Sequence, residues 1–225
     1  MSCLLTIDTS LEMASVSIVK EGELIGIETN TAQKDHAAWL QPAIQDMFDK
    51  ATISLTELDA IGVVAGPGSY TGLRVGMASA KGLCYALKKP LITLDGLYVQ
   101  AAAFQKSFPE TGFICPMIDA RRMEVFTALY SFDLVQLLDP QAMVLDEGCF
   151  DPWLVEQPVF FIGNGAAKYK VLLKSANARF PKWTISPVDI ARITHEIYDK
   201  EGFANLAYAE PMYVKAFYHP VKANS

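Results

Sequence analysis

The sequence has no run of about 20 uninterrupted apolar residues, the length that a membrane-spanning helix needs. Its first five residues carry no charged side chain, and Asp8 soon interrupts the apolar stretch that a secretory leader would need. The four cysteines form no CxxC pair and no spacing typical of a zinc site. These absences predict a soluble, cytoplasmic protein with free thiols and no attachment to membranes.

Positive charge is also scarce, with 19 Lys and Arg against 25 Asp and Glu and a net charge of −6. A protein that binds nucleic acid alone gains much of its affinity by neutralising phosphates. We therefore expect any nucleic acid to be bound only through a larger complex. The three histidines form neither HxxxH nor HExxH, and no GxSxG is present. The sequence thus predicts no metal site and no serine-hydrolase site.

What is present is typical of a well-packed globular chain, 225 residues long and 51% apolar. Alternating residues predict three consecutive strands, the last two forming a hairpin at Glu21-Gly22-Glu23. A helix with apolar residues at 3.6-residue spacing follows, beginning either at Pro42 or at an earlier turn from Asp35 that is kinked there. A strand at 61–65, a helix at 72–87 and a strand at 91–94 complete a mixed sheet with crossover connections.

The best boundary lies at 109–112, after a helix over 96–106. It divides the chain into a first lobe, 1–108, and a second lobe, 109–225, with the option that the extreme C-terminus packs back on the first. The second half repeats the order of the first, with strands at 113–118, 124–131 and 159–162 and helices after Gly165 and after Pro187. We therefore expect an α/β fold made of two degenerate copies of one plan.

The segment Gly66-Pro67-Gly68-Ser69-Tyr70-Thr71-Gly72 joins the strand at 61–65 to the next helix. Glycines let a backbone approach a ligand closely, and N–H groups at a helix N-terminus bind anions. Ser69 or Thr71 is placed to cap the helix or to contact a phosphate. The segment is neither a Walker A loop nor a GxGxxG motif. It is therefore either a phosphate-facing loop or a tight, capped turn.

The helix at 72–87 carries small residues on one face: Gly72, Gly76, Ser79, Ala80 and Leu83. Glycine inside a helix costs roughly 1 kcal/mol relative to alanine, so close packing should compensate. That packing is either against the protein's own sheet or against a helix of another subunit.

Two further polar segments have alternative explanations. Asp8-Thr9-Ser10 follows the first strand, where it either faces phosphates or forms an ordinary turn. Asp119-Ala120-Arg121-Arg122-Met123-Glu124 is either a solvated, internally paired hairpin turn or a place where adjacent arginines meet a phosphate or an acidic partner.

Taken together, these segments resemble the TsaB (YeaZ) family. The resemblance rests on Leu5–Ser10, Leu58–Ile61, the string from Gly66 to Gly76, Ile118–Arg122 and Gly163-Asn164-Gly165. It implies a two-lobed actin/acetate-kinase/heat-shock-protein-like (ASKHA) fold with mixed central sheets. It also implies a subunit that pairs with itself or with the catalytic paralogue TsaD and works with the ATPase TsaE. The resemblance further implies that these subunits together transfer threonylcarbamoyl to the adenosine beside the anticodon of ANN-reading tRNAs. It implies that this subunit contacts tRNA only through the complex.

The resemblance assigns pairing to the helices at 42–51 and 72–87. The partner-binding residues expected from it are His36, Leu40, Ile44, Met47, Gly72, Gly76, Ser79, Ala80 and Leu83. The residues of an inherited phosphate site, with room for weak ATP or ADP binding but no required cofactor, are Asp8, Gly66, Gly68, Ser69, Thr71 and Gly72.

The catalytic paralogue holds a metal through an HxxxH motif, and Gly96 and Gln100 stand where its two histidines are expected. Glycine has no donor atom, and glutamine is a poor ligand for a transition metal. We therefore expect no catalytic residues, no metal site and a non-catalytic subunit. The alternative is an enzyme in its own right, either an ATP-dependent phosphotransferase or the M22-type peptidase of older labels.

Overall fold

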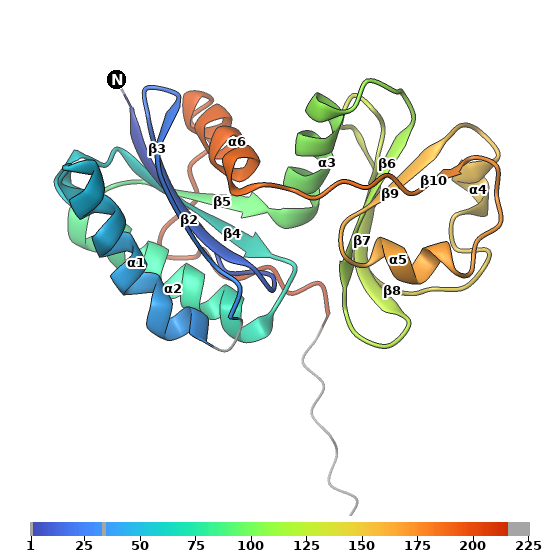
Figure 1. Ribbon diagram of the computed structural model, residues 1–225, viewed down its shortest axis with the longest axis horizontal. Helices are drawn as coiled ribbons and strands as arrows, with labels where there is room; N and C mark the ends of the chain where they lie inside the picture. Colours follow the sequence, from blue (N-terminus) through green and yellow to red (C-terminus); the bar gives the residue numbers. More distant parts are fainter. Residues whose placement is uncertain (1, 33–34, 216–225) are drawn as a thin grey trace, which may run out of the picture.

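A computed structural model describes residues 2–32 and 35–215, which form two lobes side by side (Figure 1). The elements of the first half are β1 (Cys3–Asp8), β2 (Ala14–Lys20), β3 (Glu23–Asn30), α1 (His36–Ala51), the 3-10 helix η2 (Leu55–Glu57), β4 (Ala60–Gly66), α2 (Tyr70–Leu87), β5 (Leu91–Asp95) and α3 (Gly96–Ser107). Those of the second half are β6 (Phe113–Asp119), β7 (Glu124–Tyr130), β8 (Gln136–Val144), α4 (Asp151–Leu154), β9 (Val159–Ile162), α5 (Ala166–Lys170), β10 (Ala178–Arg179) and α6 (Pro187–Asp199).

Both sheets follow one plan. The first has the order β3-β2-β1-β4-β5, and the second, taken from its opposite edge, reads β8-β7-β6-β9-β10. In each, the first strand is central, antiparallel to the second and parallel to the fourth. The duplication and the fold class predicted from the sequence are therefore confirmed. The prediction missed β8, an edge strand in which no residue is fully buried and whose apolar pattern is accordingly weak, and the two-residue β10.

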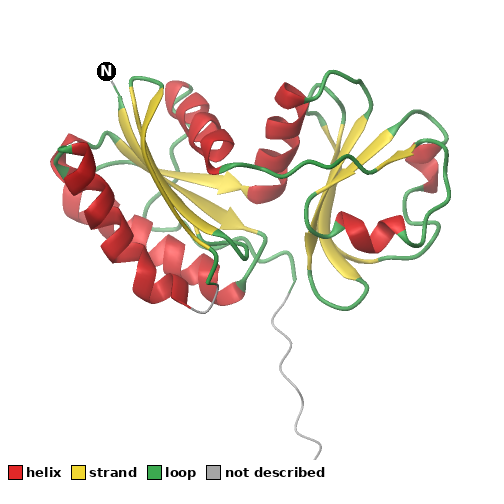
Figure 2. Ribbon diagram, viewed as in Figure 1, coloured by secondary structure: helices red, strands yellow, loops and turns green. Residues whose placement is uncertain are grey.

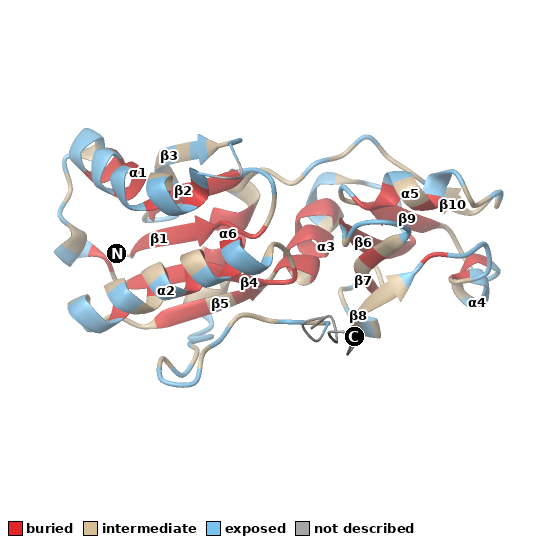
Figure 3. Cartoon of the chain, turned by 90° about the horizontal axis from the view of Figure 1, so that it is seen from below, coloured by how far each residue is buried: buried red, intermediate tan, exposed pale blue. Residues whose placement is uncertain are grey.

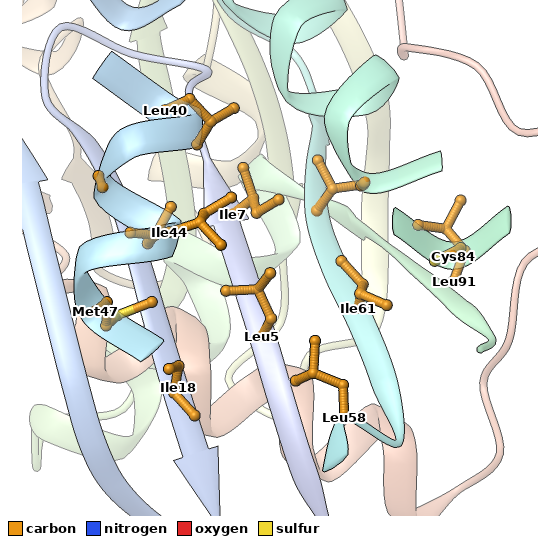
Figure 4. Close-up of a cluster of buried hydrophobic side chains, with 14 of the residues drawn as sticks. Leu5, Ile7, Ile18, Leu40, Ile44, Met47, Leu58, Ile61, Cys84 and Leu91 are labelled. Atoms are coloured by element: carbon orange, nitrogen blue, oxygen red, sulfur yellow. The ribbon is translucent and has the colours of Figure 1, made fainter. Parts of the chain in front are cut away.

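The first sheet lies between α1 and α2 on one face and α6 on the other (Figure 2). The apolar stripe of α1 faces the sheet, where Leu40, Ile44 and Met47 pack beside Ile7, Leu5 and Ile18 (Figure 4). This contact is why the helix forms despite Pro42, which lies inside it. Of the two starts that the sequence left open, the earlier one is correct, since the helix begins at His36.

Helix α3 lies between the lobes and contributes to both cores. Val99, Ala102 and Ala103 belong to the core of the first lobe, whereas Leu97 and Phe104 belong to that of the second. A helix that is apolar on all sides is stable only when it is covered on all sides. Helix α3 therefore joins the hydrophobic cores of the two lobes.

The division at 108/109 needs a correction, because the chain returns to the first lobe. Helix α6 packs on the first sheet, with Ile190 and Ile193 in the same core as Leu4. Residues 203–215, which we call the strap, then run along the first lobe. The Ala204 N–H donates to the Leu91 carbonyl at 2.8 Å, and the Met212 N–H donates to the Ala65 carbonyl at 2.7 Å. We also expected the extreme C-terminus to pack back on the first lobe. That prediction concerns residues that lie largely outside the described ones, since the structure follows the chain only to Lys215.

None of the helices in the described ranges combines the length and the apolarity needed to cross a membrane.

Candidate functional site in the cleft between the lobes

A cleft of about 640 Å³ lies between the lobes. The first lobe contributes the turn after β1 and the segment between β4 and α2, and the second lobe contributes the β6–β7 turn and the residue after Gly163. The principal polar residues of its lining are Ser10, Glu12, Ser69, Thr71, Asp119, Arg121 and Asn164.

The three glycines where β4 passes into α2, Gly66, Gly68 and Gly72, face the protein's own backbone. A Cβ on Gly68 would lie 2.2 Å from the Ser10 carbonyl oxygen, and one on Gly72 would lie 2.0 Å from that of Thr9. Gly66 adopts a φ of +137°, and a Cβ there would lie 2.6 Å from the carbonyl oxygen of Met212 in the strap. The space that these glycines leave open is therefore filled by the turn after β1 and by the strap rather than by a ligand.

Ser69 caps α2, since its Oγ accepts a hydrogen bond from the Gly72 N–H at 3.3 Å. Its own N–H donates to the Ser10 carbonyl at 2.7 Å. These bonds are those of a tight, capped turn, one of the two alternatives that the sequence leaves open. The helix N-terminus still lies at the cleft, since Gly68, Ser69 and Thr71 line it.

Asp8 is directed inward rather than toward this cleft. Its side chain is buried, and its Oδ1 accepts hydrogen bonds from the Ser10 N–H at 2.8 Å and the Ser10 Oγ at 2.6 Å. Burial raises the pKa of this carboxyl above its ordinary value, although the bonds from Ser10 oppose the shift. Of the expected phosphate-site residues, Gly68, Ser69 and Thr71 thus lie in the cleft, and Asp8, Gly66 and Gly72 do not.

The β6–β7 turn supplies the charged wall of the cleft. Asp119 Oδ1 accepts from the Arg121 N–H at 2.6 Å and from Lys168 Nζ at 2.7 Å, and the Asp119 N–H donates to Asn164 Oδ1 at 2.9 Å. Partial burial raises the pKa of Asp119, but the bonds from Lys168 and from the Arg121 N–H outweigh it and lower that pKa overall. The sequence identified the turn at 119–124 and the segment at 163–165 separately. It did not show that Asn164, Ser10 and Glu12 line one cleft.

The expected partner-binding residues need a correction. The side chains of His36, Leu40, Ile44 and Met47 are 0–4% exposed and lie in the first lobe, so they are not available to a partner. Helix α2 turns Gly72, Gly76 and Ala80 toward its own sheet as well, where a Cβ on Gly76 would lie 2.4 Å from Thr9 Oγ1. Ser79 and Leu83 are half-buried, and Ser79 Oγ accepts a hydrogen bond from Gln41 Nε2 of α1 at 3.0 Å. The alternative of packing against the protein's own sheet is thus correct for the glycine face.

A different face of α2 points outward beside the exposed side of α1 (Figure 3). It carries Ala78, Gly82 and Tyr85, spaced four and three residues apart, and the Tyr85 side chain is 82% exposed. No atom of the described residues lies within 4 Å of a Cβ placed on Gly82. We call these three residues the outer face of α2.

Gly96 and Gln100 both line a small cavity beside Asp8 at the start of α3. Gly96 is the first residue of the helix, which Asp95 caps by accepting the Leu97 N–H at 2.8 Å. Within residues 2–32 and 35–215, no group of three or more His, Cys, Asp or Glu side chains is placed to hold a metal ion.

Two lobes with one repeated strand order and a cleft between them define an α/β protein of the actin/acetate-kinase/heat-shock-protein fold class. A family model described as "TsaD: tRNA N6-adenosine threonylcarbamoyltransferase" matches residues 14–209. The tRNA threonylcarbamoyladenosine biosynthesis protein TsaB of Bacillus subtilis is 30% identical over 179 residues, covering 76% of this chain and 75% of that protein. The chain belongs to the TsaB (YeaZ) family, as its GPGSYTGLRVG string led us to expect.

Two further similarities are informative. The tRNA N6-adenosine threonylcarbamoyltransferase of Thermodesulfovibrio yellowstonii is 28% identical over 140 residues, covering 55% of this chain and 42% of that protein. The solved structure of YeaZ from Pseudomonas aeruginosa superposes with a TM-score of 0.77 at 26% identity, covering 95% of this chain and 100% of that one.

Proposed function

We propose that the chain is a non-catalytic subunit of the machinery that makes threonylcarbamoyladenosine on ANN-reading tRNAs. It pairs with a TsaD-type catalytic paralogue and acts with a TsaE-type ATPase in the cytoplasm. The observation that carries the proposal is the family match, together with the similarity to a threonylcarbamoyltransferase over half of the chain.

The residues at 96 and 100 support a non-catalytic role. Gly96 has no side chain to offer a metal, and the amide of Gln100 is a weak donor for a transition metal. Gln100 is also 4% exposed, and its Oε1 lies 2.6 Å from the point that a Cβ on Gly163 of the second lobe would occupy, so it packs where the lobes meet. A subunit of this kind contributes binding surface rather than reacting groups.

The outer face of α2 supports a pairing role. Tyrosine is enriched at the centre of protein interfaces, and small residues allow two helices to approach closely. The outer face of α2 has the small residues Ala78 and Gly82 and the tyrosine Tyr85. Helix α1 lies beside this face, and Gln41 of α1 donates a hydrogen bond to Ser79 of α2. A TsaD-type partner or a second copy of this chain would meet this face rather than the buried residues first expected.

The test is co-purification of the TsaD-type paralogue with wild type, Tyr85→Asp and Val155→Asp. Val155 is 81% exposed in the second lobe, so it receives the same charge at an equally exposed apolar position. We expect Tyr85→Asp to lose the partner and Val155→Asp to retain it, with circular dichroism unchanged in both. If wild type does not retain the paralogue, the proposed function is wrong; if both variants retain it, only the surface is wrong.

We also propose that nucleotide binding is weak and is not required. The support is that three of the six expected phosphate-site residues, Asp8, Gly66 and Gly72, are engaged by the chain itself, whereas Gly68, Ser69 and Thr71 line the cleft. Titration calorimetry with ATP and ADP tests this. Submicromolar affinity, or ATP turnover by the isolated chain, would favour the phosphotransferase alternative.

A further inference from the structure

The tip of the β6–β7 turn has an unusual backbone. Arg121 has a φ of 71° and Arg122 a φ of 47°, so two consecutive arginines occupy the left-handed region. Turns of this kind between strands favour Asn-Gly or Gly-Gly, because other residues adopt that conformation at an energetic cost. Local packing does not explain arginine here, since both residues are exposed.

In the described ranges, neither the Arg121 nor the Arg122 side chain makes a hydrogen bond or an ion pair. The acids on the same turn are already neutralised, Asp119 by Lys168 at 2.7 Å and Glu124 by Lys215 at 2.6 Å. The turn therefore carries a local positive excess on a chain whose net charge is −6.

The turn holds these arginines in place before any ligand arrives. The Arg121 N–H is bound to Asp119, the Asp119 N–H is bound to Asn164, and the Ala120 N–H donates to the Glu124 carbonyl at 3.1 Å. A fixed backbone reduces the ordering cost of binding. Guanidinium groups are the side chains best matched to phosphate, because their donors form a planar fork.

Across the cleft, the first lobe presents an aromatic ring and a helix N-terminus. Tyr70, the first residue of α2, lines the cleft together with Arg121, and its ring contacts both the Arg74 guanidinium, 3.9 Å from its centroid, and the ring of Tyr213, whose centroid lies at 5.3 Å. Arg74 therefore adds a positive charge beside the Tyr70 edge of the cleft. Glu12, which is exposed, also lines the cleft and adds one negative charge to the side opposite Arg121.

We propose that Arg121 and Arg122 bind the phosphates of a single-stranded RNA segment that lies across the mouth of the cleft. The inference rests on the proposed function, which supplies the RNA, and it identifies where this subunit touches it. The arginines bind the RNA backbone without reading its sequence.

The experiment measures binding of a fluorescein-labelled anticodon stem-loop RNA with an ANN-reading anticodon, by the full chain alone and together with its TsaD-type partner. Wild type is compared with Arg121→Gly/Arg122→Gly, in which glycine preserves the turn. The control is Arg179→Ala/Lys182→Ala, which removes two exposed positive charges at and beyond β10, at the far edge of the same sheet. We expect the glycine pair to weaken binding at least tenfold and the control to change it little. The plot of the logarithm of the RNA association constant against the logarithm of the salt concentration should become shallower by about 1.4 in the glycine pair, because each single-strand phosphate contact contributes roughly 0.7 to its slope.

Co-purification of the partner, measured on the same samples, separates this inference from the proposed function. If the partner is retained but the glycine pair binds RNA like wild type, or wild type binds no RNA in either form, the inference is wrong and the proposed function stands. ATP or polyglutamate that displaces the RNA at equal anion concentration would also overturn it, in favour of a mononucleotide or an acidic peptide.

Discussion

The carbonyl oxygen of Thr9 lies 2.0 Å from the point that a Cβ on Gly72 would occupy. The hydroxyl of Thr9 donates to the Gly72 carbonyl at 2.7 Å, and it lies 2.4 Å from the corresponding point on Gly76. Helix α2 therefore contacts the turn after β1 backbone to backbone, which side chains at 72 and 76 would prevent. The glycines that resemble a ligand loop in the sequence hold two segments of the protein together.

This contact predicts opposite effects for two glycines on one helix. Gly72→Ala should lower the free energy of unfolding by about 1–3 kcal/mol, the usual cost of overpacking. Gly82→Ala meets no atom of residues 2–32 and 35–215 within 4 Å and should raise the free energy of unfolding by up to about 1 kcal/mol, because alanine is the better helix former. Urea unfolding of the two variants measures this. Equal midpoints would contradict the packing that we assign to Gly72.

The buried Asp8 predicts a specific dependence on pH. Its pKa is raised in the folded protein, so the folded state favours the protonated carboxyl. Its contribution to stability is then fully present below its ordinary pKa of 3.8 and is lost as the pH rises through the higher folded value. Asp8→Asn keeps an oxygen that accepts from the Ser10 N–H and Oγ, and it carries no charge.

Asp8→Asn should therefore unfold at a higher urea concentration than wild type at neutral pH, and the difference should shrink as the pH falls toward 4. Unfolding midpoints measured across this range test the sign. A difference that grows on acidification would show that the charged form of Asp8 stabilises the fold.

The architecture was predictable because its signals are local. Single elements are indicated by short segments: the hairpin at Gly22, the apolar stripe of α1 and the segment from Gly66 into α2. The order of strands and helices is the same in both halves, and this order predicts the duplication. The partner surface was not predictable in the same way. Periodicity identifies which residues of α2 share a face, but Gly72, Gly76 and Ala80 suit the protein's own sheet and another subunit equally well.

The rest of the site depends on contacts between distant segments. Asn164 and Asp119 lie 45 residues apart, and Met212 covers Gly66 across a far longer stretch of chain. The return of α6 and the strap to the first lobe has no local signal either, because the sequence shows an amphipathic helix but not the sheet that it covers. The left-handed backbone at Arg121 was likewise invisible, since glycine is the usual residue there.

The strap offers a third prediction, because Lys81 of α2 binds it. Lys81 Nζ donates to the Ala209 carbonyl at 2.7 Å, so Lys81→Met should loosen the segment while keeping the apolar stem of the side chain. Hydrogen exchange at the amides of Ala204 and Met212 should become faster, and the amides of β1 should be unaffected. Lys88→Met is the control, since Lys88 lies exposed at the end of the same helix. Unchanged exchange in Lys81→Met would mean that the backbone bonds alone retain the strap.

The last prediction separates stability from function at the β6–β7 turn. Glycine avoids the cost of a left-handed backbone, about 1–2 kcal/mol per residue, but loses roughly 0.5–1 kcal/mol through the freedom of the unfolded chain. Arg121→Gly/Arg122→Gly should therefore raise the free energy of unfolding by about 1 kcal/mol, seen as a higher midpoint in urea. Lys182→Gly is the control, because Lys182 has an ordinary negative φ and should lose stability or stay unchanged. If the glycine pair unfolds more easily than wild type, the arginines stabilise the turn, and their strain is no argument for a binding role.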